Sequence, residues 1–308
     1  MKRYILLRVG QAVLSILAVS VIVFLLGRLS GDPVDLMAGI DASPEQRAAM
    51  EEHLGLDKPL PVQYGIFLGH ALKGDFGTSL SKNRPTADLI RERFPATLQL
   101  AAAAALIALV ISVPIGVYSA RRRGGFFDFV ARMMAVLGQS VPSFFLGMML
   151  ILLFAIQLGW LPVAGREGLN LKYLILPAIA LGWGISAGIM RLTRSSMLEV
   201  LDTDYVKLAR IKGVSEFKVT WKHAFKNAAL PVLTYAAMIF VIILGGTVVI
   251  EMVFAWPGLG RLVVEAVQTR DFPVVQTVVM MLCALFIFTN LIVDIVYGYL
   301  NPKIKYSR

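Results

Sequence analysis

The sequence feature that most constrains the fold is a set of six long segments that contain no Asp, Glu, Lys or Arg. An α-helix needs about 20 apolar residues to cross the hydrocarbon core of a membrane, and each segment supplies most or all of one. Only 16% of the residues are charged, against about 25% in a soluble domain. The sequence therefore predicts an all-α, multi-pass membrane protein. The predicted spans are residues 9–28, 98–120, 133–158, 173–194, 227–250 and 273–298.

The first span requires a choice between a retained helix and a signal peptide, because Lys2, Arg3 and Arg8 precede it. Its uncharged stretch, residues 9–26, is longer than the apolar core of about 7–15 residues in a signal peptide. No small-x-small cleavage site follows it. We therefore expect a retained first helix.

The basic residues indicate the orientation of the six spans. An even number of spans places both termini on one side, and Lys and Arg concentrate in cytoplasmic segments. With the termini inside, residues 1–8, 121–132, 191–226 and 299–308 are cytoplasmic and hold most of the 30 basic residues. The net charge of +10 then reflects topology, with the anionic lipids of the inner leaflet as partner rather than nucleic acid.

Catalytic and metal-binding patterns are missing from the sequence. Cys283 is the single cysteine, which excludes a disulfide framework and a cysteine-based metal site. The chain has no His-Glu-x-x-His and no Gly-x-x-x-x-Gly-Lys-Ser/Thr phosphate loop. We therefore predict a chain that is not an enzyme and binds no cofactor or metal itself.

Two segments between the spans are long enough to have a role. Residues 29–96 predict a small external subdomain, with a short helix at 44–54 that Ser43 caps and a turn at 74–79. Residues 195–226 predict two short helices, the first ending at Gly213 and the second starting after Ser215. This pair fits either an amphipathic element on the inner leaflet or a docking element for a cytoplasmic partner, where Ala209 and Gly213 permit close approach.

Four segments carry a resemblance to a known family. They are Asp204–Glu216 with His223–Pro231, Gly31–Pro33, Gly74–Gly77 and Phe254–Arg261. The first resembles the EAA loop of ABC-importer permeases, and the four together resemble the branch that imports oligopeptides, dipeptides, glutathione and nickel. The leading Glu of that loop corresponds to Lys207 here, so no role of the Glu is carried over.

The resemblance implies the fold and partners of a type I ABC importer permease. Its organisation here would be a first transmembrane helix (1–28), a periplasmic subdomain (29–96), a permease core with a coupling loop at about 195–228 (97–300), and a cytoplasmic tail (301–308). The implied partners are a second, homologous permease in a heterodimer, two ATPases that bind ATP and Mg, and a periplasmic or lipid-anchored substrate-binding protein. The implied location is the bacterial inner membrane.

The resemblance also implies site residues. The helix around residues 205–213 would be the coupling helix, seated in a groove of an ATPase. Asp204 and Glu216 either cap helices or pair with bases of the partner, and capping is favoured. The residues assigned to this coupling loop are Asp204, Tyr205, Lys207, Ala209, Arg210, Gly213 and Glu216.

Two further groups are assigned to the route of the substrate. The outer mouth is assigned Trp256, Pro257, Gly258, Gly260 and Arg261, in a loop whose aromatic residues suit the outer membrane interface. The pathway is assigned Gln139, Ser140, Pro142, Gly245 and Gly246, with ordinary helix packing as the favoured alternative. Asp294, in the last span, is either functional or an interfacial pairing residue.

The substrate is the least constrained property of the chain. Few polar groups lie in the spans, which favours a wide passage and hence di- or oligopeptides. Glutathione or a nickel chelate carried by the same machinery is the alternative. An ATP-independent carrier or channel is the competing class, and such proteins usually show buried charge or internal repeats.

Overall fold

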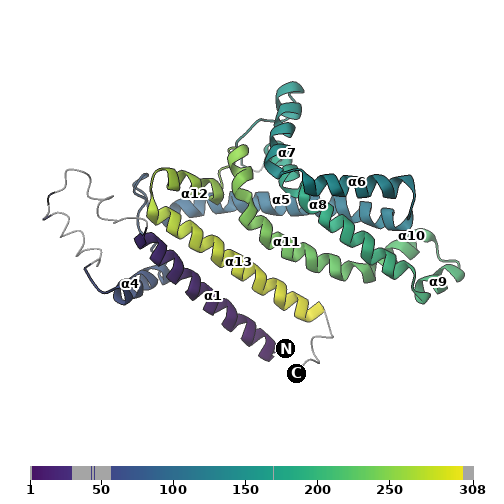
Figure 1. The fold of residues 1–308 in the computed structure, drawn as a ribbon, viewed down its shortest axis with the longest axis horizontal. Coiled ribbons are helices and arrows are strands. Elements are labelled where there is room, and N and C mark those ends of the chain that lie inside the picture. Colours follow the sequence, from purple (N-terminus) through teal and green to yellow (C-terminus); the bar gives the residue numbers. More distant parts are fainter. Residues whose placement is uncertain (1, 30–42, 44, 46–56, 169, 301–308) are drawn as a thin grey trace. The chain divides into compact units, whose positions relative to one another are not determined.

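The computed structural model describes residues 2–29, 43, 45, 57–168 and 170–300. These residues are helical apart from turns and one isolated bridge between Thr78 and Pro85. The sequence predictions for Gly31–Pro33, for a helix at 44–54 and for the tail at 301–308 lie outside the described residues. The elements (Figure 1) are α1 (Lys2–Leu29), α4 (Leu60–Leu72), α5 (Thr86–Arg121), α6 (Phe126–Ser140), α7 (Ser143–Leu150), the π-helix η1 (Ile151–Gln157), α8 (Leu171–Leu201), α9 (Asp204–Ile211), α10 (Glu216–Lys218), the π-helix η2 (Val219–Phe225), α11 (Lys226–Val253), α12 (Leu259–Gln268) and α13 (Phe272–Leu300).

The chain forms two compact units. The first unit comprises residues 1–96 and 258–291. Its core lies where the start of α5 meets α12 and α13, and the buried residues are Leu89, Ile90, Leu259, Leu262, Ala266, Val274 and Val278. In the same unit, α4 packs on α1. The rings of Tyr64 and Phe24 meet edge to face with their centres 5.6 Å apart, and the hydroxyls of Tyr64 and Ser20 share a hydrogen bond of 2.8 Å.

The second unit comprises residues 97–257 and 292–308, and α8 is its centre. This helix contacts α6, α7, α9, α11 and η2. Glycines allow the helices to approach closely: a Cβ atom at Gly182 would lie 2.8 Å from the carbonyl oxygen of Ala104, and one at Gly138 would lie 3.0 Å from the Cβ of Ala187. Such small-residue contacts are the usual means of packing helices within a membrane.

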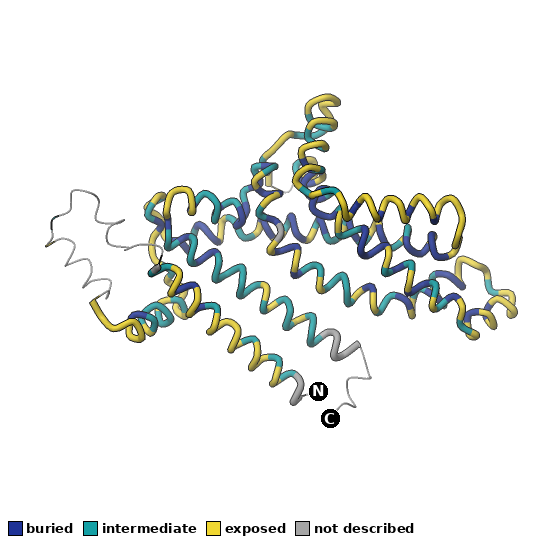
Figure 2. The backbone as a smooth tube through the Cα atoms, in the orientation of Figure 1, coloured by how far each residue is buried: buried dark blue, intermediate teal, exposed yellow. Residues whose placement is uncertain are grey.

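Five helices are long and apolar enough to cross a membrane. They are Ile5–Arg28, Thr86–Arg121, Leu171–Leu201, Glu216–Gly245 and Phe272–Ile295, and they confirm five of the six predicted spans. Many positions along these helices are exposed (Figure 2), and they include large apolar residues such as Leu14, Leu106 and Phe286, as lipid contact requires.

The third predicted span, residues 133–158, is a bent pair of helices, which together are apolar enough to form the sixth span. The two helices, α6 and α7, meet at an angle of 104°. Val141 has extended backbone angles (φ −89°, ψ 119°), because the ring of a following proline disfavours the helical conformation. Pro142 therefore ends one helix and begins the next. Hydropathy summed over residues 133–158 does not register this change of direction.

Candidate functional site

The loop between α8 and α11 contains a short helix with a defined end. α9 runs from Asp204 to Ile211, and Gly213 follows it with a positive φ of +78°. The amide of Gly213 donates to the carbonyl of Arg210 at 2.9 Å, and that of Val214 donates to Ala209 at 3.2 Å. This pair of hydrogen bonds is the Schellman motif, in which glycine adopts the left-handed conformation at low cost. The predicted helix end at Gly213 is confirmed.

One face of α9 is buried against the rest of the same unit. Val206 is fully buried and Ala209 is 8% exposed. They belong to one apolar cluster, which also contains Val117, Ala120, Met197, Leu201, Val219, Ala224 and Ala228. These residues come from α5, α8, η2 and α11, so α9 shares one apolar cluster with these elements and contacts α8 and η2 directly. Ala209 therefore supports packing within the chain and does not form part of an open stripe with Gly213.

The opposite face of α9 is exposed and combines apolar with basic side chains. Ile211 is 81% exposed, Leu208 49% and Tyr205 43%. Lys207, Arg210 and Lys212 are exposed beside them. Two exposed aliphatic side chains among three cations are typical of a surface that meets another protein rather than water alone.

The acids of this loop pair with bases of the same chain. Glu216 accepts a hydrogen bond from Arg210 at 2.9 Å, and Asp204 lies 3.3 Å from the Nζ of Lys207. Neither acid is an N-cap, since Thr203 and Ser215 occupy those positions and make no side-chain cap hydrogen bond. The favoured capping role of Asp204 and Glu216 is therefore wrong. The Arg210–Glu216 pair spans the turn between α9 and α10, whereas the Asp204–Lys207 pair lies within α9.

The segment after Gly213 continues directly into α11. Its middle is the π-helix η2, so the side chains do not keep the 3.6-residue spacing of an α-helix. Ala224 and Ala228 are buried, and Trp221 packs against the same apolar cluster. Phe217 lies before the π-helix and is 70% exposed.

A buried ion pair connects α6 to α8 near this loop. Asp128 is 1% exposed and accepts two hydrogen bonds from the guanidinium of Arg194, at 2.6 and 2.9 Å. Ser119 donates to the same carboxylate at 2.5 Å and the amide of Gly124 at 3.0 Å. Sequence reasoning missed this pair. The available signal was that Asp128 is the lone acid among the basic residues of segment 121–132.

The residues assigned to the outer mouth divide between the two units. In the second unit, Trp256 is 1% exposed and Phe254 is 2% exposed, and the guanidinium of Arg166 lies 5.9 Å from the centre of the Trp256 ring. Gly165 donates its amide to the carbonyl of Phe254 at 2.8 Å. The expectation that these aromatic residues anchor the loop at the membrane interface is wrong, because both are core residues. Pro257 is half-buried.

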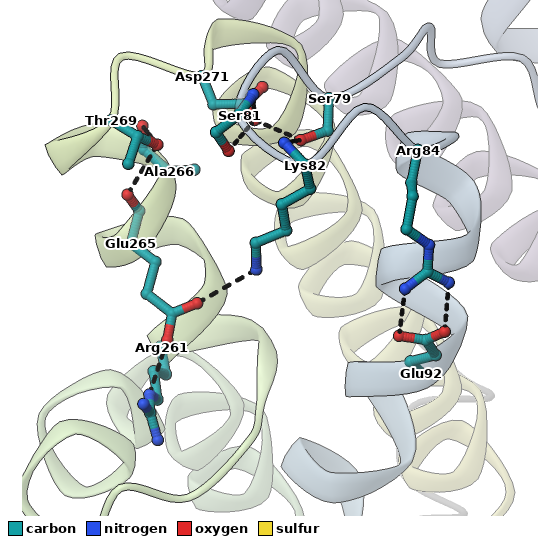
Figure 3. Close-up of polar contacts among 10 residues, drawn as sticks. All are labelled: Ser79, Ser81, Lys82, Arg84, Glu92, Arg261, Glu265, Ala266, Thr269 and Asp271. Carbon is teal, nitrogen blue, oxygen red and sulfur yellow. Dashed lines mark hydrogen bonds and ion pairs between the residues drawn. The ribbon is translucent and has the colours of Figure 1, made fainter.

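In the first unit, Gly258 and Gly260 are buried at the start of α12, and Arg261 pairs with Glu265 at 2.8 Å. Figure 3 shows that Glu265 also faces Lys82, at 3.4 Å. The 74–79 turn is confirmed, with φ of +77° at Gly74 and +75° at Gly77.

Asp271 ties residues 79–81 to the turn between α12 and α13 (Figure 3). Its carboxylate accepts hydrogen bonds from the hydroxyls of Ser79 (2.5 Å) and Ser81 (2.7 Å) and from the amides of Leu80 and Ser81 (both 3.1 Å). Burial raises the pKa of Asp271, but these four hydrogen bonds outweigh it and hold the pKa below its usual value. The carboxylate is therefore ionised at neutral pH.

The pathway residues lie at exposed positions of the second unit. Gln139, Ser140 and Pro142 are exposed at the bend between α6 and α7. A Cβ atom at Gly245 would meet nothing within 4 Å, so helix packing within this chain does not account for that glycine. The surroundings of Gly246 are outside the described residues, and Asp294 is half-buried.

Comparison with known proteins agrees with this architecture. Residues 112–306 match the family model described as binding-protein-dependent transport system inner membrane component, and residues 1–101 match its N-terminal companion. The chain is 42% identical over 308 residues to the glutathione transport system permease protein GsiC of Salmonella choleraesuis, and 41% identical to that of Escherichia coli K12, with complete coverage of both.

Solved structures show the same fold at low sequence identity. One inward-facing structure of the MetNI methionine ABC transporter aligns with a TM-score of 0.58 at 18% identity, covering 69% of this chain and 96% of that one. An amino acid ABC transporter solved with histidines aligns with a TM-score of 0.52 at 16% identity, covering 69% and 94%.

Proposed function

The chain belongs to the family of binding-protein-dependent transport system inner membrane components, and from this premise we propose that it forms part of an importer for short peptides, with glutathione as the first candidate. It is the multi-pass permease component of an ABC importer in the inner membrane. The observation that carries the substrate class is the 42% identity, over the full length of both chains, to permeases named for glutathione transport. Glutathione is itself a tripeptide, which joins it to the peptide class expected from the sequence.

We propose that the exposed face of α9 is where an ATPase subunit acts on this chain. Ile211 and Leu208 supply an apolar contact, and the surrounding Lys207, Arg210 and Lys212 supply cations for acidic groups on the partner. The alternative, a helix lying on lipid, requires the apolar face of α9 to be available. That face, with Val206, is buried against the chain's own helices.

Membership of this family also supports proposals for the other subunits of the transporter. The family requires an ATPase and a substrate-binding protein as partners. We propose two ATPases that hold ATP and Mg, so that this chain holds no cofactor, and a second homologous permease beside it. In this proposal the basic segments place both termini and α9 in the cytoplasm. The segment 256–261 lies on the external side, where the half-buried Pro257 and Arg261 are its residues accessible to the binding protein.

We propose that the bend between α6 and α7 faces the passage, together with Gly245. The support is that Gln139, Ser140 and Gly245 are exposed within the second unit although they lie in helices that span the membrane or form the bent pair. Small and neutral polar groups of this kind suit a peptide that must pass without being held.

Uptake by the reconstituted transporter tests these proposals. Proteoliposomes would contain this chain with its second permease, ATPases and binding protein, and receive labelled glutathione, a dipeptide, an oligopeptide or a nickel chelate. ATP-dependent uptake of glutathione or a dipeptide supports the peptide class, and uptake of the chelate alone refutes it. Transport without ATP would contradict the importer itself.

A matched pair of variants tests the role of α9 in the same vesicles. Ile211→Glu places a charge on the exposed face of α9, whereas Leu72→Glu places one on α4, and both wild-type side chains are 81% exposed. We expect Ile211→Glu to abolish uptake and to release the ATPases during purification, and Leu72→Glu to retain both. Equal behaviour of the two variants would remove α9 from the proposal.

A further inference from the structure

A groove in the second unit combines apolar walls with a cluster of arginines. It has a volume of about 280 Å³ and lies where the end of α5, the start of α6 and η2 come together. The lining residues that matter here are Ile115, Tyr118, Arg121, Phe127 and Trp221. The groove does not include the exposed face of α9, so the proposed ATPase contact leaves it without an assigned role.

The walls of the groove are mainly hydrocarbon and aromatic rings. Tyr118 and Phe127 pack edge to face, with ring centres 5.0 Å apart at 85°. Trp221 packs in the same manner on Phe225, at 5.3 Å. Phe126, at the start of α6, is 83% exposed beside this site. A channel of this kind suits a flexible acyl chain better than a polar solute.

The mouth of the groove carries positive charge that no acid neutralises. Arg121 lines the groove, and Arg122 and Arg123 follow it, all three exposed. The guanidinium of Arg122 lies 5.0 Å from the centre of the Tyr118 ring, which holds it at the groove. Within the described part of the chain, no carboxylate lies within ion-pair distance of these arginines. The nearest acid in sequence, Asp128, forms an ion pair with Arg194 and is 1% exposed.

The position along the chain places this charge at a membrane boundary. The span-forming helix α5 ends at Arg121, so the arginines begin where the apolar segment stops. Arginine at such a boundary reaches the phosphate layer of the lipid, while the residues one to two turns earlier remain at the depth of the acyl chains. Arg121 and Ile115 therefore match the two chemically distinct parts of one lipid molecule.

We propose that this groove is a binding site for one anionic phospholipid, with an acyl chain between Tyr118, Phe127 and Trp221 and the headgroup phosphate on Arg121 and its two neighbours. The site selects an anionic over a zwitterionic lipid because three cations without acids attract net negative charge. It depends on the chain's membrane position and not on the substrate or on the role of α9.

Trp221 provides a direct measurement of occupancy. The complete transporter is reconstituted in phosphatidylcholine vesicles that contain either phosphatidylglycerol or phosphatidylcholine with brominated acyl chains, at the same mole fraction. Bromine quenches tryptophan fluorescence only at contact, and subtracting the spectrum of a Trp221→Phe transporter isolates this residue. We expect brominated phosphatidylglycerol to occupy the site at least about five-fold more than brominated phosphatidylcholine, because the attraction of even one basic residue to anionic lipid is roughly 1 kcal/mol.

Two charge-matched variants separate a site from general surface charge. Replacing Arg121, Arg122 and Arg123 by Gln removes three charges at the groove, and we expect it to reduce the preference to about one. Replacing Lys58, Lys73 and Lys172 by Gln removes three exposed charges elsewhere, and we expect the preference to persist. Equal quenching by both brominated lipids in the wild type would show ordinary surrounding lipid and overturn the site. An equal loss of the phosphatidylglycerol preference in both variants would also overturn it, and so would the absence of any quenching of Trp221.

Discussion

Replacing Arg194 should destabilise the fold strongly, because it leaves the carboxylate of Asp128 buried without its main partner. Breaking a buried ion pair by removing one partner costs about 3–5 kcal/mol. Arg194 is itself 20% exposed, and Ser119 and the Gly124 amide remain as donors to the carboxylate. Water and these two donors reduce the cost, so we expect a loss of about 3 kcal/mol in the free energy of unfolding for Arg194→Met.

A double-mutant cycle separates this mechanism from lost packing. Asp128→Asn removes the buried negative charge but keeps an oxygen that accepts from Ser119 or Gly124. In the double variant with Arg194→Met no buried charge remains, so its loss should be smaller than the sum of the single losses by about 2–3 kcal/mol.

The free energies come from unfolding of the chain by SDS in mixed micelles, followed by circular dichroism. Arg132→Met is the control, since the Nε of Arg132 lies 3.8 Å from Asp128 and its side chain is 50% exposed. That variant should change the free energy of unfolding by less than about 1 kcal/mol. Equal losses for Arg132→Met and Arg194→Met, or a coupling energy below about 1 kcal/mol, would refute the role of the pair.

Three further outcomes follow from particular residues. Gly182→Ala should lower the free energy of unfolding by about 1–3 kcal/mol in the same SDS titration, because its Cβ would lie 2.8 Å from the carbonyl oxygen of Ala104. Gly245→Ala is the control and should leave the free energy of unfolding unchanged, because no atom lies within 4 Å of the added Cβ. Gly213→Val should cost about 2 kcal/mol and reduce ATP-dependent uptake, because Gly213 has φ of +78°; Gly213→Asn, which tolerates that conformation, should retain uptake. Asp271→Asn should destabilise the chain at pH 7 in thermal melts. The pKa of Asp271 is lowered in the folded state, so its contribution is present above its unfolded pKa of about 3.9 and is lost as the pH falls through the folded value. A difference from wild type that does not narrow as the pH is lowered below about 3.9 would contradict this.

The spans were predictable because they depend only on where charged residues occur along the sequence. A helix in hydrocarbon must be apolar along its whole length, so the distribution of charge alone located five of them. The apolar segment of the third span was located in the same way, but hydropathy carries no direction, and Pro142 divides this segment into two helices at 104°. The end of α9 was predictable for a similar local reason, since Gly213 acts within its own turn.

Contacts between distant residues were not predictable from one sequence. Asp128 and Arg194 are 66 residues apart, and nothing local to either selects the other. Trp256 was expected at the membrane interface because tryptophan suits both an interface and a core, and only the position of Arg166 and α11 in three dimensions decides between them. The exposure of Phe217 also depends on the π-helix η2 that follows it. The i→i+5 hydrogen bonds of a π-helix change the register of the side chains, and no sequence pattern predicts where this happens.

The packing of α9 has a mechanical consequence for the proposed coupling. Its inner face contacts α8 and η2 and belongs to one apolar cluster that also includes residues of α5 and α11. Because protein interiors are close-packed and resist compression, we expect a force applied at Ile211 to be transmitted through this cluster and not merely to bend a loop. Arg194 lies two turns before the end of α8 and adds α6 to this group through Asp128. The bend at Pro142 then separates α6, which the ion pair joins to α8, from α7, which contacts α8 and α11, and it is there that Gln139 and Ser140 are exposed.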